Sequence, residues 1–200
     1  MRSLQAIIVF ASVTFAAATA HAASVVAVGT SDLTARCDFI FHGTALRSWT
    51  AAGPSKGSIR TYVEFSVADV LKGDRNLSKV TLSYLGGVLN GRGLRVEGLR
   101  LPRIGEEGVY FVERLGRSQV HPLYGWDQGR FLVREDADGR KAVFTHDRKP
   151  VRGFDQMTGA PGMVATAGHA GGVRIADDDR QALSLAEFKQ RVRALVETRQ

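Results

Sequence analysis

The sequence has little of several features that identify common protein classes. Its 200 residues include one cysteine, so it forms neither an internal disulfide nor a thiolate zinc cluster. Dinucleotide-binding loops, P-loops and hydrolase nucleophile elbows are missing, and no two histidines have the spacing that places metal ligands on one face. These absences argue against an enzyme and against a bound metal or cofactor.

The composition is that of one globular domain. Hydrophobic residues make up 44% of the chain and charged residues 24%, which fits neither a disordered protein nor a coiled coil. The 22 glycines favour turns and bulges over long helices. The formal net charge of +7 favours anionic partners.

The first 22 residues have the pattern of a secretory signal peptide. Arg2 supplies the positive start, 4–18 is apolar, and Ala20-His21-Ala22 is a small-x-small cleavage site. An uncleaved membrane anchor is the alternative, but the apolar run is shorter than the roughly 20 residues of a comfortable span. We therefore expect cleavage after Ala22 and a periplasmic or extracellular protein without a membrane span.

Residues 23–150 have the pattern of a β-barrel domain. Strands are predicted at 39–46, 59–71, 80–84, 109–112, 129–133 and 141–144, the last two as a hairpin. The alternation of the second strand shifts near Ala68-Asp69, which predicts a β-bulge. The uniformly apolar run Val109–Val112 indicates a strand that is buried on both faces or lies in a barrel. A short helix over Ser31–Arg36, capped by Ser31, precedes the strands.

The C-terminal residues 183–198 predict an amphipathic helix docked on the barrel. Ser184 and Glu187 have capping-box spacing. The apolar face comprises Leu185, Phe188, Val192, Leu195 and Val196. Docking is expected because a helix this short is marginal alone, and a membrane-surface helix is the alternative. Residues 151–182 are rich in glycine and are expected to be a loop or linker, or a compact binding loop.

Three short stretches in fixed order resemble known secreted domains. They are Cys37-Asp-Phe-Ile-Phe-His-Gly43, Val67-Ala-Asp-Val-Leu-Lys-Gly73, and Ile104-Gly-Glu-Glu107 followed by Val109–Val112. The order is similar to that of uncharacterised secreted bacterial domains and, more distantly, of netrin-like modules and tissue inhibitors of metalloproteinases. Over residues 31–135, this resemblance implies an OB-like (netrin-like) Greek-key barrel followed by a C-terminal helix.

The chain departs from the metalloproteinase inhibitors at Cys37. Their zinc-chelating cysteine stands at the mature N-terminus, whereas residues 23–36 precede Cys37 here. That cysteine's role therefore carries over to no position of this chain. In an oxidising compartment Cys37 is either buried or paired with another chain. Its strand-like apolar neighbours favour burial.

The segment Asn90–Arg103 is the main candidate for a binding surface. Its basic residues are Arg92, Arg95, Arg100 and Arg103. A guanidinium group donates paired hydrogen bonds to phosphate, sulfate or carboxylate, so this segment suits an anion. The alternative is a β-hairpin whose arginines only face solvent. Trp126 is a further candidate, as a stacking surface or as a rim aromatic.

We expect a secreted, non-catalytic interaction module that binds a protein or an anionic envelope partner. Three alternatives remain open. The resemblance allows a modulator of a secreted metalloprotease, and the charge and predicted fold allow an oligonucleotide-binding OB domain, although export argues against nucleic acid. The third alternative is a hydrolase or metal enzyme. No catalytic residue, metal ligand or cofactor is assigned.

Overall fold

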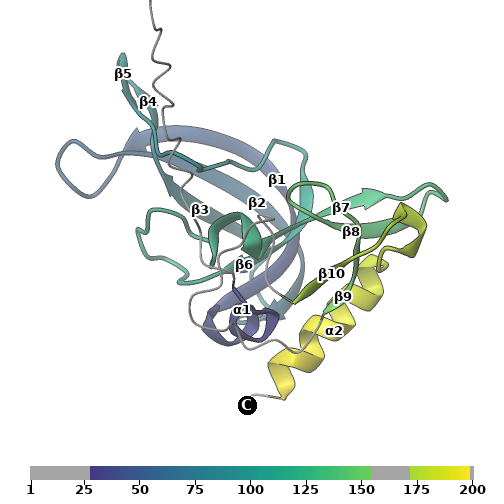
Figure 1. Ribbon diagram of the computed structural model, residues 1–200. Coiled ribbons are helices and arrows are strands. Elements are labelled where there is room, and N and C mark those ends of the chain that lie inside the picture. Colours follow the sequence, from purple (N-terminus) through teal and green to yellow (C-terminus); the bar gives the residue numbers. More distant parts are fainter. Residues whose placement is uncertain (1–27, 155–171, 199–200) are drawn as a thin grey trace, which may run out of the picture.

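A six-stranded antiparallel sheet organises the protein in the computed structural model, which describes residues 28–154 and 172–198 (Figure 1). The sheet comprises β1 (Phe39–Ala52), β2 (Ile59–Lys72), β3 (Lys79–Leu85), β6 (Glu107–Val112), β7 (Arg130–Glu135) and β8 (Lys141–Thr145). The strand order is β3-β2-β1-β6-β7-β8. A mainly β fold is thus confirmed. Within the described ranges no sheet closes on itself, so the predicted OB-like barrel is not confirmed.

The strand order contains a Greek key. The strands β1, β2 and β3 follow one another as neighbours, and the next strand of the sheet, β6, returns to lie beside β1. Every pair in the sheet is antiparallel. The predicted hairpin of the last two strands is confirmed as the β7–β8 pair.

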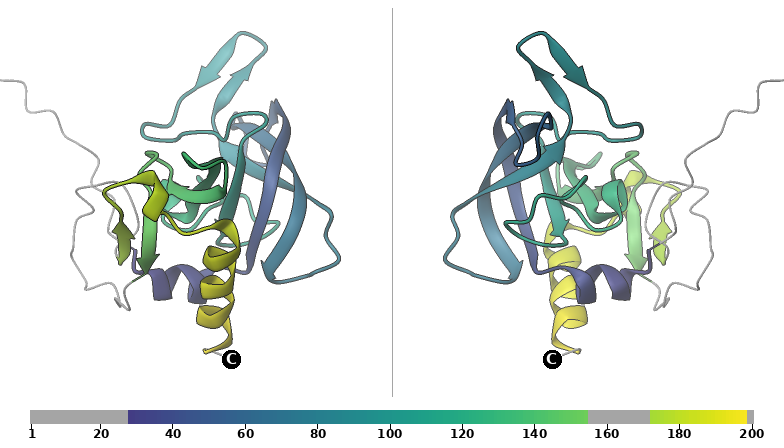
Figure 2. Two further views of the ribbon diagram at one scale, coloured as in Figure 1. Left: turned by 90° about the vertical axis from the view of Figure 1, so that its right-hand side faces the viewer. Right: turned by 90° about the vertical axis from the view of Figure 1, so that its left-hand side faces the viewer.

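Smaller elements lie around the sheet. They are helices α1 (Thr30–Arg36) and α2 (Leu185–Glu197), hairpins β4 (Gly87–Leu89) with β5 (Arg92–Leu94) and β9 (Val151–Phe154) with β10 (Val173–Ile175), and 3₁₀ turns at Trp126–Gly129 and Asp179–Gln181. The β4–β5 hairpin projects from one end of the molecule, whereas both α-helices lie at the other end (Figures 1 and 2). Neither α-helix is long and apolar enough to cross a membrane.

The predicted β-bulge is present. His42 is paired with Asp69 and Gly43 with Val67, which leaves Ala68 as an extra residue on β2. The strand β1 continues to Ala52 instead of ending at position 46, because its half-polar second part pairs with the start of β2.

The sheet buries side chains on both of its faces. Tyr110 and Val112 of β6 belong to a cluster with β2 and β3, whereas Val109 and Phe111 belong to a cluster with the two helices. All four side chains are at most 2% exposed. The prediction of a doubly buried strand at 109–112 is therefore confirmed.

Helix α2 covers the second cluster as its periodicity predicts. Phe188 and Val192 are fully buried, which contributes about 1.5–3 kcal/mol each before entropy. The Ser184 hydroxyl accepts from the Glu187 N–H and the Glu187 carboxylate accepts from the Ser184 N–H, so the predicted capping box is present.

Two sequence predictions need correction. Helix α1 begins at Thr30 with Gly29 as its N-cap and has no side-chain cap, because Ser31 lies inside the helix. The predicted loop or linker over 151–182 is not irregular throughout, since its ends form β9 and β10, which pair with each other. The predicted signal peptide, 1–22, lies outside the described residues.

Candidate anion-binding site

The predicted binding segment is not a single hairpin. Strands β4 and β5 are joined by Asn90 and Gly91, whose φ values of 50° and 75° fit a type I′ turn. The hairpin ends at Leu94, and residues 95–106 then run as a largely irregular segment to β6. This chain path separates the four predicted arginines.

All four arginines are exposed, but only two of them share a site. Arg92 lines a hollow beside the turn between β1 and β2, and Arg95 lines a groove next to the β4–β5 hairpin. Arg100 and Arg103 lie together in another hollow of about 510 Å³. We call this hollow the arginine cleft.

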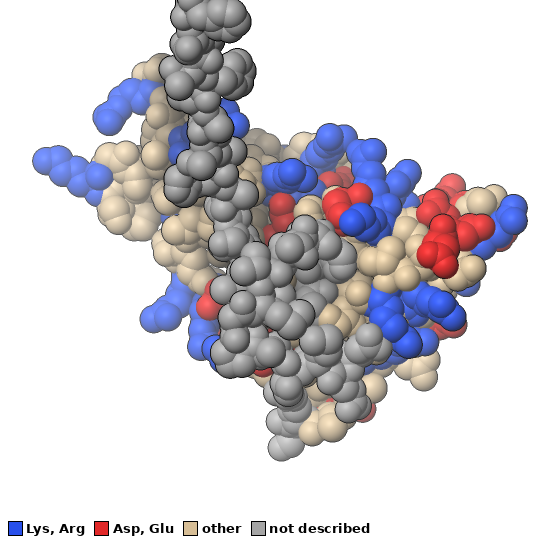
Figure 3. Space-filling model, in the orientation of Figure 1, with Lys and Arg blue, Asp and Glu red and all other residues tan. Residues whose placement is uncertain are grey.

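The arginine cleft brings together residues far apart in the sequence. Its lining is Arg100, Leu101, Arg103, Glu106, Arg130, Leu132, His146, Asp147 and Arg148. These residues come from the segment before β6, from β7 and from the turn that follows β8. Figure 3 shows basic side chains, interspersed with a few acidic ones, gathered near β7 and β8.

Arg130 is the buried basic residue of the cleft. Its side chain is 9% exposed. Its Nη2 donates to Glu106 Oε2 at 3.1 Å, and its Nη1 donates to the Arg100 carbonyl oxygen at 3.2 Å. Asp127 Oδ1 lies 3.7 Å from Nη1. Because a buried guanidinium loses its hydration, these acceptors are what make burial of the charge tolerable.

The rim arginines are not neutralised in this way. Across the two described ranges, the guanidinium groups of Arg100, Arg103 and Arg148 form no ion pair with a carboxylate. The acids of the cleft have other partners, since Glu106 binds Arg130, and Asp147 lies 3.2 Å from Lys149 Nζ. The rim therefore presents three unpaired positive charges.

Arg148 is held in an unusual backbone conformation. Its φ of 66° lies in the left-handed region, which side chains other than glycine seldom adopt. The turn is fixed by bonds from Arg148 N to Thr145 O and from Thr145 N to Lys149 O. Such strain clusters at functional sites and costs of order 1–3 kcal/mol.

A buried polar region adjoins the cleft. His146 Nε2 lies 3.9 Å from Asp127 Oδ2. Burial raises the pKa of Asp127 and lowers the pKa of His146. Among the described residues, His146 Nδ1, Asp127 Oδ1, the Tyr84 hydroxyl and His121 Nε2 are buried without a hydrogen-bond partner. Since buried polar atoms are ordinarily bonded, this region suits ordered water or the polar atoms of a ligand.

Trp126 lies beside this polar region and does not line the cleft. Its ring stacks on the His121 ring at 5.4 Å and is half-buried. One face of the indole is therefore occupied within the protein.

His42 and Cys37 are packed inside the protein. His42 is 7% exposed on β1, and its Nε2 lies 2.9 Å from Glu107 Oε1, as befits a packed strand histidine. Cys37 is 1% exposed, as predicted. In the part of the chain that the structure describes, no group of three or more His, Cys, Asp or Glu side chains is placed to hold a metal ion.

Sequence reasoning missed Arg130, His146 and Arg148. A signal existed for Arg130, because it is a charged residue at the start of an apolar strand and such a residue is seldom buried unless paired. No signal existed for Arg148, which follows an aspartate in an ordinary polar turn. The chain matches no known protein-family model, no curated protein and no solved structure.

Proposed function

We propose that the protein is an interaction module that binds an anionic group of a protein or envelope partner in the arginine cleft. The observation that carries the proposal is the convergence of three unpaired rim arginines on a hollow that also contains the buried Arg130. Each guanidinium fork donates two hydrogen bonds to one carboxylate or phosphate. A partner that supplies such groups would neutralise charges that the protein leaves unpaired.

We also propose that the module acts without catalysis. The lining offers three groups able to act as a nucleophile or a general base, and each of them contacts a charged group of the protein. Glu106 binds Arg130, Asp147 lies 3.2 Å from Lys149 Nζ, and His146 Nε2 lies 3.9 Å from Asp127 Oδ2. The lining arginines remain protonated at any physiological pH and bind anions instead of exchanging protons.

The proposal also includes export and a barrel-like fold. The pattern of residues 1–22 supports secretion, and recovery of a chain that begins at Ala23 from the periplasm or medium would test it. The Greek-key strand order supports an OB-like, netrin-like barrel that is open between the edge strands β3 and β8. Residues 113–125 contact both β3 and β6, through Leu85 N to Val120 O and the Val112–Leu123 bridge.

The experiment uses fluorescence anisotropy to compare the affinity of the wild-type protein and of two variants for fluorescein-labelled polyaspartate. A cleft variant, Arg100→Ser with Arg103→Ser and Arg148→Ser, is expected to bind at least about tenfold more weakly, since charge-assisted hydrogen bonds contribute roughly 1.5–3 kcal/mol each. The matched control, Lys56→Ser with Arg75→Ser and Arg117→Ser, removes as many exposed charges outside the cleft.

Equal losses in the cleft variant and the control variant would contradict the proposal, because they would show that only net charge matters. A second experiment measures the affinity of the wild-type protein for single-stranded DNA at two salt concentrations. Tighter binding of the DNA than of polyaspartate, with a steep fall at higher salt, would instead support the oligonucleotide-binding alternative.

A further inference from the structure

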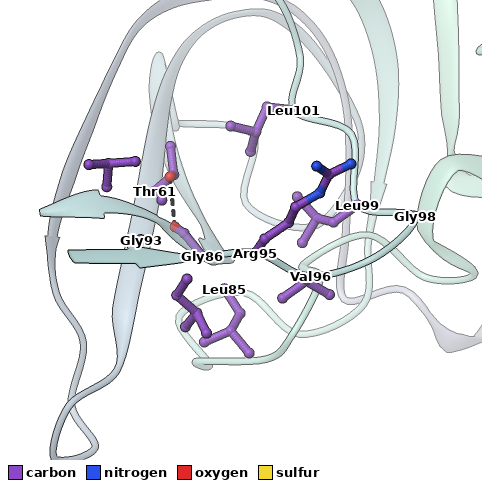
Figure 4. Close-up of a pocket in the computed structure, with 12 residues that line it drawn as sticks. Thr61, Leu85, Gly86, Gly93, Arg95, Val96, Gly98, Leu99 and Leu101 are labelled. Carbon is purple, nitrogen blue, oxygen red and sulfur yellow. Dashed lines mark hydrogen bonds between the residues drawn. The ribbon is translucent and has the colours of Figure 1, made fainter. Parts of the chain in front are cut away.

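A second hollow borders the arginine cleft. It has a volume of about 440 Å³ and lies between the β4–β5 hairpin and the segment 95–101 (Figure 4). Its aliphatic lining consists of Leu85, Val88, Leu94, Val96, Leu99 and Leu101. Val88 is 70% exposed and Leu101 37% exposed, so apolar surface remains in contact with water. We call this hollow the apolar groove.

The apolar groove and the arginine cleft are contiguous. Leu101 lines both hollows, and Arg100, which precedes it, lines the cleft. Arg95 extends along the groove beside Leu99 (Figure 4) and forms no ion pair among the described residues. A ligand that occupies both hollows must therefore combine apolar groups with negative charge.

Glycine backbone forms much of the groove wall beside the aliphatic side chains, together with Thr61 and Arg95. Gly86, Gly87, Gly93 and Gly98 line it. Leu89 and Arg92 flank the two-residue turn and form a hydrogen-bonded pair. The next pair, Val88 and Gly93, is a non-hydrogen-bonded pair, because the two kinds of pair alternate along an antiparallel ladder. The N–H and C=O of Gly93 therefore point away from β4. Outside the strand ladder, no other described backbone group bonds to Gly93.

We propose that the two hollows together bind an extended acidic segment of a partner polypeptide. An aspartate or glutamate lies in the arginine cleft, and a bulky apolar residue two positions away, on the same side of the extended backbone, lies in the apolar groove. This inference rests on the proposed function, because it assigns the anion to a peptide carboxylate.

The groove fits a peptide better than a lipid. Successive side chains of an extended peptide point in opposite directions, so one enters an open groove while the next faces water. The backbone edge at Gly93 gives such a peptide main-chain hydrogen bonds, as in β-strand addition. An acyl chain makes no use of these groups and needs an enclosed apolar channel.

The test uses two short fluorescein-labelled peptides of equal charge. In one, the repeat Asp-Ser-Leu-Ser places aspartate and leucine on the same side of the extended chain, and in the other, serine replaces each leucine. Wild-type protein is expected to bind the leucine peptide at least about tenfold more tightly than the serine peptide. Burial of one leucine side chain contributes enough free energy for a tenfold difference in affinity. The cleft variant described above is expected to bind both peptides weakly.

Gly93→Trp is designed to fill the groove without disturbing the fold. A Cβ at Gly93 would meet no heavy atom within 4 Å, and its φ is not in the left-handed region. This variant is expected to bind the leucine peptide only as tightly as the serine peptide. Ser118→Trp adds the same bulk at an exposed site elsewhere and should keep the preference. Val88→Ser, at a largely exposed position, repeats the test if Gly93→Trp does not fold.

The outcomes separate the two proposals. If the wild-type protein binds both peptides equally and the cleft variant binds both weakly, the proposal of a peptide in the apolar groove is overturned, whereas the anion site in the arginine cleft is supported. Failure of both peptides and of polyaspartate to bind would overturn both proposals. Tighter, Gly93→Trp-sensitive binding to phosphatidylglycerol vesicles than to either peptide would overturn the peptide in favour of a lipid.

Discussion

Arg130 supports the cleft through its two nearest carboxylates. With Arg130→Met, Glu106 and Asp127 would remain largely buried beside an apolar side chain. We expect the free energy of unfolding to fall by about 3–5 kcal/mol, as when one partner of a buried ion pair is removed. Urea denaturation followed by circular dichroism measures this change.

The matched control is Arg134→Met on the same strand. Arg134 is exposed and lies over the Phe144 ring at 5.5 Å, a contact worth about 0.5–1 kcal/mol. A loss at Arg130 no larger than the loss at Arg134 would show that the buried ion pair contributes nothing specific.

Cys37 gives a second prediction at the residue scale. Its side chain is buried, and burial raises the pKa of the thiol, so the reactive thiolate is scarce. The native protein is therefore expected to react with Ellman's reagent only at the rate of unfolding, whereas an exposed Ser118→Cys thiol reacts at once. Rapid labelling of Cys37, or a disulfide-linked dimer on a non-reducing gel, would refute this expectation.

Individual residue roles were the hardest to predict from the sequence. Burial of Cys37 followed from its apolar neighbours. Of the partners of Arg130, Asp127 is only three residues earlier in the chain, but Glu106 could not be predicted because it belongs to the separate segment before β6. Local patterns carry no information on which distant loops meet.

At the scale of elements, α2 is joined to the sheet by charge as well as by apolar packing. Asp69 accepts hydrogen bonds from Lys189 at 2.6 Å and from Arg193 at 2.8 Å. Burial alone would raise the pKa of Asp69, but these two bonds outweigh it and lower the pKa below its usual value of 3.8. Because the folded state lowers this pKa, the stabilisation is fully present above about pH 3.8 and is lost as the pH falls through the folded value.

Asp69→Asn is thus expected to lower the free energy of unfolding by about 1 kcal/mol at neutral pH. The difference from wild type should shrink as the pH falls below 4. Urea denaturation across this pH range measures it, and Asp38→Asn, which breaks an exposed ion pair with Arg114, serves as the control. A difference that persists unchanged at acid pH would rule out the charge as its cause.

Elements were more predictable than residues where the signal was local. Alternation located β2 and β3, the slip at Ala68 located the bulge, and the Ser184–Glu187 spacing located the start of α2. The second half of β1 was missed because it is held by pairing with β2 and not by its own apolar pattern. The end of β5 at Leu94 was not predictable, because nothing in the local sequence marks it.

For the whole molecule, the doubly buried strands should be the slowest to open. Backbone amides of Val109–Val112 are expected to exchange hydrogen slowest, at rates near those of global unfolding. Amides of the projecting β4–β5 hairpin should exchange fastest among the strands. Hydrogen exchange followed by mass spectrometry measures both, and equal protection would contradict the described layering.

The global arrangement was only partly predictable. The sequence indicated many short strands with a docked C-terminal helix, and both are present. Closure of the sheet would require its edge strands, β3 and β8, to pair. The chain between them includes residues 113–125, which contact β3 and β6 instead. The hydrophobic periodicity of single strands does not indicate which distant segments pair.

The left-handed backbone of Arg148 sets stability against ligand binding, which matters for protein engineering. Arg148→Gly would relieve the strained turn and raise the melting temperature, with a gain of about 1 kcal/mol, yet it would delete one of the cleft's three unpaired charges. A screen that ranks variants by melting temperature alone would therefore enrich proteins that are more stable but bind the ligand more weakly.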